Sequence, residues 1–239
     1  MAARVVDNLA RVRERIATAA ERSGRDPSAI TLVAVTKYAQ SASLAALIEA
    51  GCLDLGESRP QQLWERAKEF AGRGVRWHMI GHLQRNKVPR TAPLVTLLHS
   101  CDSLRIADAL DQALVQSQNG SSDEAQPLDT LLEVNISTDP AKGGFAPDDV
   151  EAGLAHVATL RHLRVRGLMA MAGKPDDASA AHADFRHLRE LSERLKSHCP
   201  PGVTLDELSM GMSGDYEVAI EEGATIVRVG SALFEGVEP

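Results

Sequence analysis

The sequence of 239 residues has few aromatic side chains, which make up 3% of the chain. Its 26 lysines and arginines stand against 33 aspartates and glutamates, so the formal net charge is −7, and no basic cluster stands out. Proteins that bind nucleic acids rely on basic surfaces and on aromatic side chains that stack on bases. The scarcity of both argues against a nucleic-acid partner.

Cysteine is also scarce, and Cys52, Cys101 and Cys199 lie far apart, without a CxxC or metal-ligand spacing. This pattern favours reduced thiols in a cytoplasmic protein and predicts no metal site. No apolar run approaches the length of a membrane-spanning helix. The opening stretch MAARVVDNLARVRERI contains acidic residues and no apolar core, so we expect neither a signal peptide nor a membrane partner.

What the sequence does contain is a regular alternation of apolar, β-branched runs with amphipathic segments. Val5, Leu9, Val12 and Ile16 recur at helical spacing and predict a helix at the start of the chain. The apolar runs predict eight strands, near residues 31–36, 53–55, 76–80, 94–98, 128–135, 163–169, 205–208 and 225–229. The remaining patterns predict a polar surface loop over 117–127 and helices near 43–50, after Pro60, and over 103–115, 147–158 and 178–196.

This order of elements is typical of an α/β protein of the (β/α)8 TIM barrel class, with an extra helix at the N-terminus. A doubly wound open sheet is the alternative fold. Because the chain stops at Pro239, shortly after the last predicted strand, we expect residues 1–239 to form a single domain. In a barrel the loops after the strands meet on one face, where functional residues gather. His78 and His82, near the end of the third strand, are expected to make ordinary hydrogen bonds there.

Lys37 stands at the carboxyl end of the first predicted strand, in the run ITLVAVTKY. We expect its side chain to be partly buried, which would lower its pKa and make its amine a nucleophile toward aldehydes. The alternative is a lysine that only reaches solvent from a strand end.

Two loops and one arginine add to this lysine on the same predicted face. The loops after the last two strands read LSMGMSGD and VGSALFEG, and their glycines and serines suit a phosphate group. Ordinary strand-to-helix turns can have the same composition. Arg228 lies inside the apolar strand TIVRV and needs a partner, either a structural carboxylate or a ligand atom. A Schiff-base lysine, a phosphate cradle and a buried guanidinium together point to pyridoxal 5′-phosphate (PLP).

Longer stretches carry a more specific signal, above all GHLQRNK and LSMGMS with VRVG. In order along nearly the whole chain stand VAVTKY, LGESRPQQ, WHMIGHLQRNK, HSCDS, EVNIS, DPAKGG, RGLMAM and LSMGMSGDYEVAIEEGATIVRVGSALFEG. With these stretches the chain resembles the pyridoxal phosphate homeostasis protein family, single-domain relatives of the N-terminal barrel of alanine racemase, which is fold type III among PLP proteins. The resemblance implies PLP as the cofactor.

The resemblance also implies roles for individual residues. Lys37 would form the Schiff base with PLP, the internal aldimine, and Arg228 would face the pyridine nitrogen. The other residues implied to bind the cofactor are Ser58, Ser209, Met212, Ser213, Gly230 and Ser231, of which Ser213, Gly230 and Ser231 would hold the phosphate. The family usually has Asn where this chain has Ser58, and a hydroxyl offers one donor where an amide offers two.

The function implied by the resemblance is intracellular PLP homeostasis by a cytoplasmic monomer, with PLP-dependent apoenzymes as candidate acceptors. The alternatives are a low-activity PLP enzyme of racemase type and an aldolase-type barrel that uses Lys37 on a phosphorylated sugar. Amino-acid turnover would distinguish the racemase-type enzyme from a carrier. An absorbance band from a bound cofactor, lost on borohydride reduction, would distinguish both of these from the aldolase-type barrel.

We predict a carrier rather than an enzyme. An arginine at the ring nitrogen donates a hydrogen bond without giving up its proton, so the ring stays a poor electron sink. Racemisation also needs a base on each face of the substrate carbon. In the resemblance to alanine racemase the second base is a tyrosine from another domain. Here Tyr38 follows Lys37 and, in an extended strand, would point away from it, whereas Tyr216 is expected to serve packing or solvent.

Overall fold

Eight parallel strands close into a barrel at the centre of the computed structural model, which describes residues 2–118, 126–137, 142–173 and 177–237. The strands pair in sequence order, and β8 pairs with β1. Their bounds are β1 (Thr31–Val35), β2 (Asp54–Glu57), β3 (Arg76–Met79), β4 (Leu97–Cys101), β5 (Leu128–Glu133), β6 (Leu163–Met169), β7 (Glu207–Ser209) and β8 (Ile226–Val229). The predicted TIM barrel is confirmed, and the open-sheet alternative is wrong.

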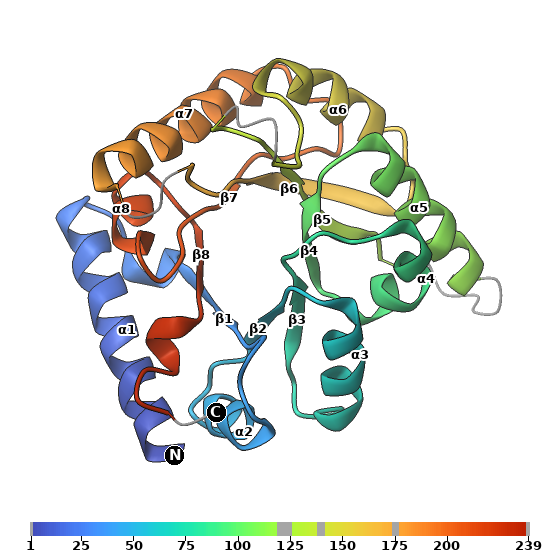
Figure 1. Cartoon of the computed structure of the whole chain (residues 1–239). Helices are drawn as coiled ribbons and strands as arrows, with labels where there is room; N and C mark the ends of the chain where they lie inside the picture. The colour runs from blue at the N-terminus through green and yellow to red at the C-terminus, as the bar shows by residue number, and fades with distance from the viewer. Residues whose placement is uncertain (1, 119–125, 138–141, 174–176, 238–239) are drawn as a thin grey trace.

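Helices surround the strands (Figure 1). They are α1 (Ala2–Arg22), α2 (Ser41–Glu49), α3 (Pro60–Glu69), α4 (Val88–Thr91), α5 (Leu104–Gln118), α6 (Val150–Val157), α7 (Ala178–Lys196) and α8 (Tyr216–Glu221). Short 3₁₀ turns are η1 (Pro27–Ala29), η2 (Arg85–Lys87), η3 (Ala92–Leu94), η4 (Pro147–Asp149) and η5 (Ser231–Leu233). The predicted N-terminal helix, α1, packs against α2 and α8. Its buried Asn8 donates to the carbonyls of Leu233 and Glu235, which ties the last described segment to the first helix.

The fourth strand begins later than the sequence predicted. Residues 92–94 form η3, because Pro93 has a fixed φ and no N–H to offer a strand ladder. β4 also ends later than the predicted bound of residue 98, so Ser100 lies within the strand and Asp102 follows it. Residues 119–125 of the predicted polar loop and 139–141 of the DPAKGG stretch lie outside the described residues.

The barrel interior combines apolar and polar side chains. Alternation along β8 places Ile226 and Arg228 on one face, and Ile226 packs in the inner cluster with residues of β1, β4, β5 and β6. Space inside is limited at β2, where a Cβ on Gly56 would lie 2.8 Å from Cγ1 of Val33. His99 and Ser209 are also buried, at 0% exposure each, and hydrogen-bond to each other across the barrel from β4 to β7.

Within the described residues, no helix has both the length and the apolar character needed to cross a membrane. Nor does that part of the chain gather His, Cys, Asp or Glu side chains in an arrangement that would hold a metal ion. The three cysteines are free thiols. Burial raises the pKa of Cys52 to about 11 and that of Cys101 to about 12, so both thiols stay protonated near neutral pH.

Candidate functional site

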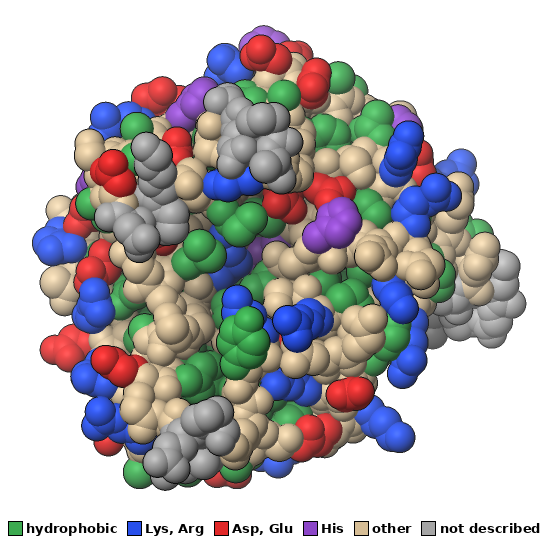
Figure 2. All heavy atoms as spheres, in the orientation of Figure 1, with side chains coloured by type: hydrophobic (Ala, Val, Ile, Leu, Met, Phe, Trp, Pro, Cys, Tyr) green, Lys and Arg blue, Asp and Glu red, His purple; other side chains and the backbone are tan. Residues whose placement is uncertain are grey.

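A cavity of about 920 Å³ opens at the carboxyl ends of the strands. Figure 2 shows this face of the molecule, hollowed near its centre where basic, acidic and histidine side chains meet. Of the residues predicted from the sequence, the lining includes Lys37, Ser58, Met212, Ser213, Arg228, Gly230 and Ser231. The lining residues that the sequence did not select as cofactor-binding include Tyr38, His82, Asp102, Glu133, Lys142, Met171 and Gly214.

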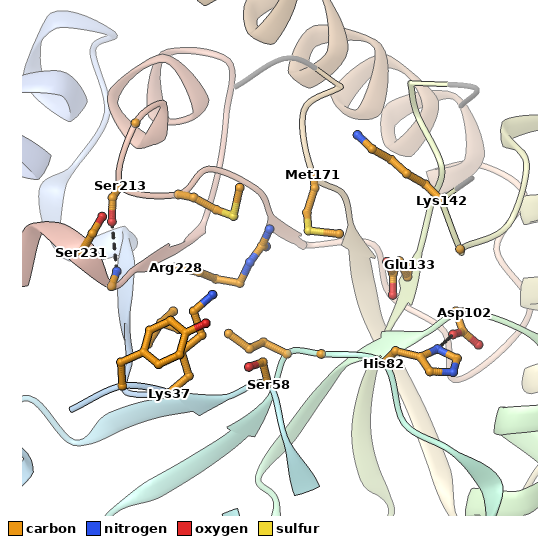
Figure 3. Close-up of a pocket in the computed structure, with 18 of the residues that line it drawn as sticks. Lys37, Ser58, His82, Asp102, Glu133, Lys142, Met171, Ser213, Arg228 and Ser231 are labelled. Atoms are coloured by element: carbon orange, nitrogen blue, oxygen red, sulfur yellow. Dashed lines mark hydrogen bonds and ion pairs between the residues drawn. The ribbon is translucent and has the colours of Figure 1, made fainter. Parts of the chain in front are cut away.

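Lys37 lies in a tight turn after β1, closed by a hydrogen bond from Ala39 N–H to the Thr36 carbonyl of 2.9 Å. Its side chain is exposed and points into the cavity (Figure 3), so the expected partial burial is wrong. Its Nζ lies 5.2 Å from the centre of the Tyr38 ring, so the expectation that Tyr38 points away is wrong as well. The reason is that the strand ends at Val35, and the alternation of an extended chain does not continue through a turn.

Side chains of helix α3 hold this turn in place by donating hydrogen bonds to the backbone carbonyls of the turn. Arg66 donates from Nη1 to the carbonyl of Thr36 and from Nη2 to that of Ala39, the latter at 2.7 Å. Gln62 donates from Nε2 to the carbonyl of Lys37 at 3.0 Å. Since these donors reach the carbonyls on both sides of the lysine as well as its own, α3 sets the position from which the amine projects.

Glu57, at the end of β2, anchors Arg66 in turn. Its side chain is 0% exposed, and its Oε1 accepts from the Arg66 guanidinium and from the Thr36 hydroxyl. Burial raises the pKa of Glu57, while the contacts with Thr36 and Arg66 oppose that rise. A buried carboxylate of this kind needs its cationic partner, which couples α3 firmly to the strand ends.

Arg228 is 4% exposed and lies at the bottom of the cavity. Its Nη1 donates to Ser209 Oγ at 2.5 Å and its Nη2 to the Ala170 carbonyl at 3.0 Å. Among the described residues no carboxylate comes within ion-pair distance of Arg228, so the structural carboxylate that the sequence left open is not its partner. Burial lowers the pKa of Arg228 to about 10, which still leaves it charged near neutral pH. Ser209 itself lies behind Arg228, outside the lining.

The loops after β7 and β8 are joined by the side chain of Ser213. Its Oγ accepts from the N–H groups of Gly230 at 3.1 Å and Ala232 at 3.4 Å. The backbone N–H groups of Ser213, Gly214 and Ser231 have no acceptor within the described part of the chain, and all three residues line the cavity. Unpaired backbone N–H groups gathered on one wall favour an anion.

The opposite wall carries Glu133 and the pair of His82 and Asp102, none of which the sequence predicted to bind the cofactor. His82 donates from Nδ1 to Asp102 Oδ2 at 2.6 Å, which confirms the expected hydrogen bonding of His82. Burial, with the nearby charge of Asp102, raises the pKa of Glu133 to about 7, while Arg228 and His82 act in the other direction. Glu133 interrupts the apolar run LLEVNI as Arg228 interrupts TIVRV, and that signal could have found it. The His82–Asp102 pair joins two loops and has no local signal.

Comparison with known proteins places the chain in a family. The family model for the N-terminal domain of alanine racemase matches residues 8–238. The pyridoxal phosphate homeostasis protein of Pseudomonas aeruginosa is 40% identical over 230 residues, which cover 96% of this chain and 94% of that protein. The chain belongs to the pyridoxal phosphate homeostasis protein family. The protein of the same name from Escherichia coli is 36% identical over 233 residues, 96% of this chain and 95% of its own.

Solved structures agree with this family assignment. PipY of Synechococcus elongatus without PLP superposes with a TM-score of 0.83 at 31% identity, covering 96% of this chain and 99% of PipY. PipY with PLP bound gives a TM-score of 0.81 at 29% identity over the same shares. An alanine racemase of Clostridium difficile, at 16% identity and a TM-score of 0.71, shares the fold over 95% of this chain and 55% of the racemase. The resemblance inferred from the motifs is confirmed.

In this family member the loop that carries Ser58 is packed tightly against its neighbour. A Cβ on Gly81, in the loop after β3, would lie 2.4 Å from the Ser58 carbonyl oxygen. Only glycine fits at this position, so the backbone of Ser58 is held at the cavity wall.

Proposed function

We propose that this chain binds PLP in the cavity and serves intracellular PLP homeostasis as a carrier. The observation that supports this function best is that one cavity brings together an amine, a buried guanidinium and a group of unpaired backbone N–H donors. PLP has a matching set of groups, namely an aldehyde, a ring nitrogen and a phosphate. The PLP-bound structure of PipY, 29% identical over 96% of this chain, supports the same ligand.

Each residue has a role that follows from its chemistry. PLP supplies an aldehyde, which makes a covalent carbon–nitrogen bond with a primary amine. Lys37 provides that amine from the turn held by α3. Arg228 has five N–H donors, of which those on Nη1 and Nη2 that face Ser209 and Ala170 are occupied, and it offers others to the ring nitrogen without losing its proton.

The remaining predicted residues surround the cofactor. Ser213, Ser231 and the backbone at Gly230 would hold the phosphate, with Gly214 as an additional N–H donor. Met212 and Ser58 would line the sides of the ring. Ser209 would act through Arg228, because it lies behind the guanidinium rather than on the cavity wall.

Exposure at the cavity mouth supports the carrier role. Lys37 is exposed, and Tyr38 beside it is 74% exposed, so an incoming amine could reach the cofactor from solvent. We propose PLP-dependent apoenzymes in the cytoplasm as the acceptors. We further propose that residues 1–239 act as one domain, since every strand of the barrel comes from this chain, and that the protein is a monomer.

The test is a visible absorption spectrum and an intact mass of the purified protein with PLP, before and after borohydride reduction. We expect an absorption band that reduction removes, a mass increase by one PLP, and a modified peptide that contains Lys37. Lys37→Ala should lose the reducible adduct and keep only weak, phosphate-anchored binding. Lys142→Ala is the matched control, because Lys142 also lines the cavity but donates to the Ala172 carbonyl. An adduct mapped to Lys142 or Lys87 would refute the assignment.

A further inference from the structure

A continuous chain of hydrogen bonds crosses the interior of the barrel from Asp54 to Arg228. His78 Nε2 lies 3.1 Å from Asp54 Oδ1, and His78 Nδ1 lies 2.9 Å from His99 Nε2. His99 Nδ1 lies 2.8 Å from Ser209 Oγ, which accepts from Arg228 Nη1 at 2.5 Å. His78 and Arg228 are each 4% exposed, and the two residues between them are 0% exposed. These side chains therefore depend on one another for their hydrogen bonds.

The two ends of this series of hydrogen bonds, Asp54 and Arg228, lie at opposite faces of the barrel. Asp54 is the first residue of β2 and is paired with Arg76, the first residue of β3. Burial raises the pKa of Asp54, but the hydrogen bonds from His78 and Arg76 bring it down to about 2. Asp54 is therefore an ionised carboxylate, which can only accept hydrogen bonds. At the other end, Arg228 lines the cavity.

With two neutral histidine rings, this fixed acceptor sets the direction of every hydrogen bond between Asp54 and Arg228. His78 must carry a proton on Nε2 to donate to Asp54, and when both rings are neutral it then accepts at Nδ1 from His99 Nε2–H. Burial, to which the charge of Arg228 adds, holds the pKa of His99 well below its usual value, so His99 is neutral and in this arrangement accepts at Nδ1 from the Ser209 hydroxyl. The Ser209 hydroxyl thus donates its hydrogen bond to His99 Nδ1, and its oxygen lone pairs accept from Arg228.

The reverse direction fails at Asp54. If His99 carried its proton on Nδ1, a neutral His78 would have to donate from Nδ1. It would then present a bare Nε2 to the carboxylate of Asp54, lone pair against lone pair. Only the forward direction satisfies all groups with two neutral rings.

We propose that His78, His99 and Ser209 are positioning residues, which lock the Ser209 oxygen as an acceptor and so fix the direction of the Arg228 guanidinium in the cavity. The proposal rests on the proposed function for its ligand, because the group presented to Arg228 is taken to be the ring nitrogen of PLP. The inner cluster around the chain is apolar, and apolar side chains of similar size would stabilise the barrel at least as well. Packing alone does not explain why polar side chains are buried here, whereas the need to orient Arg228 does.

The first experiment uses the full chain without PLP, labelled with ¹⁵N in histidine. Ring nitrogen shifts report which nitrogen carries the proton, and His78→Gln and His99→Gln assign the signals. Near neutral pH we expect both rings to be protonated on Nε2 and bare on Nδ1. A proton on Nδ1 of either ring would overturn the proposed direction of the chain.

The second experiment compares Ser209→Ala with Thr130→Val. Thr130 is a matched control, since it is also a fully buried hydroxyl residue on a barrel strand, but its hydroxyl donates locally to the Leu128 carbonyl. We expect Ser209→Ala to weaken PLP binding about tenfold and to shift the visible absorption band, because a hydrogen bond to a charged group is lost. Thr130→Val should leave both readouts unchanged. If Ser209→Ala does not fold, Ser209→Cys carries the same expectation, since sulfur is a weak acceptor of similar size.

These results separate the two proposals. Unchanged affinity and spectrum in a folded Ser209 variant would overturn the positioning role while leaving PLP binding intact. Failure of the unsubstituted protein to bind PLP would overturn the proposed function, and the tautomers of the ligand-free protein would still decide the direction of the chain.

Discussion

Glu133 is the residue whose chemistry depends most on its surroundings. It ends β5 and lines the cavity, and neither a salt bridge nor a hydrogen bond within the described residues compensates its burial. Burial and the charge of Asp102 raise its pKa to about 7 from an ordinary value of 4.5. The folded protein therefore holds this proton more tightly than the unfolded chain does.

A pH dependence of stability follows from this difference. The contribution of Glu133 is fully present below pH 4.5 and is lost as the pH rises through about 7, because the unfolded chain releases the proton first. Glu133→Gln cannot lose a proton, so its unfolding free energy should fall less between pH 4.5 and pH 8 than that of the unsubstituted protein, by about 1–3 kcal/mol. Urea denaturation of the ligand-free protein measures this. The exposed Glu69, changed to Gln, is the control, and identical pH profiles for all three proteins would contradict the prediction.

Helix α3 shows how one element can determine the position of a reactive side chain on another. Lys37 belongs to the loop between β1 and α2, yet the groups that hold its turn, Gln62 and Arg66, project from α3. The link to the barrel is the buried pair of Glu57 and Arg66, whose side chains are 0% and 13% exposed. The strength of this link can be measured directly.

We expect Arg66→Ala to destabilise the protein by about 3–5 kcal/mol, because it leaves the Glu57 carboxylate buried without a partner. Adding Glu57→Gln should recover part of that loss, since a neutral amide has a smaller burial penalty. Chemical denaturation checks both values. Arg73→Ala, which removes an exposed pair with Glu49, should change stability by less than about 1 kcal/mol. An Arg66→Ala effect no larger than that of the control would show that the buried pair of Glu57 and Arg66 contributes little to stability.

The molecule as a whole has the barrel of an alanine racemase, and the racemase of Clostridium difficile extends well beyond the matched region, which is 55% of its length. Tyr216 is 1% exposed, which agrees with the predicted packing role. Tyr38 lies directly beside the Lys37 amine and so does not offer a base on the opposite face. The cavity groups across from Lys37 are His82, Asp102 and Glu133 (Figure 3).

We expect the 239-residue chain with PLP not to racemise amino acids at an enzymatic rate. A missing acid–base group typically reduces a rate by about 10²–10⁴-fold, and an Arg228 that faces the ring nitrogen, as we propose, would in addition leave it unprotonated. The measurement is deuterium exchange at Cα of L-alanine and other amino acids in D₂O. Several turnovers per second with inversion would support the enzyme alternative, and loss of that exchange in His82→Gln would identify the opposite base.

The barrel could be predicted from local patterns, because strand and helix periods are set by neighbours in the chain. β6 and α7 have the predicted bounds, and β4 begins later than predicted, after the 3₁₀ turn that contains Pro93. Lys37, Arg228 and the glycine-rich loops could be selected for a related reason. A charge inside an apolar run, or a run of Gly and Ser after a strand, is visible without knowing what lies opposite.

The contacts that define the site depend on closure of the barrel. The chain from Asp54 to Arg228 joins residues of β2, β3, β4, β7 and β8, and the carbonyls around Lys37 meet donors from α3. The exposure of Lys37, the raised pKa of Glu133 and the pairing of His82 with Asp102 likewise come from segments far apart in the chain. Burial and hydrogen bonding are properties of surroundings, and these surroundings exist only once eight strands have closed in register.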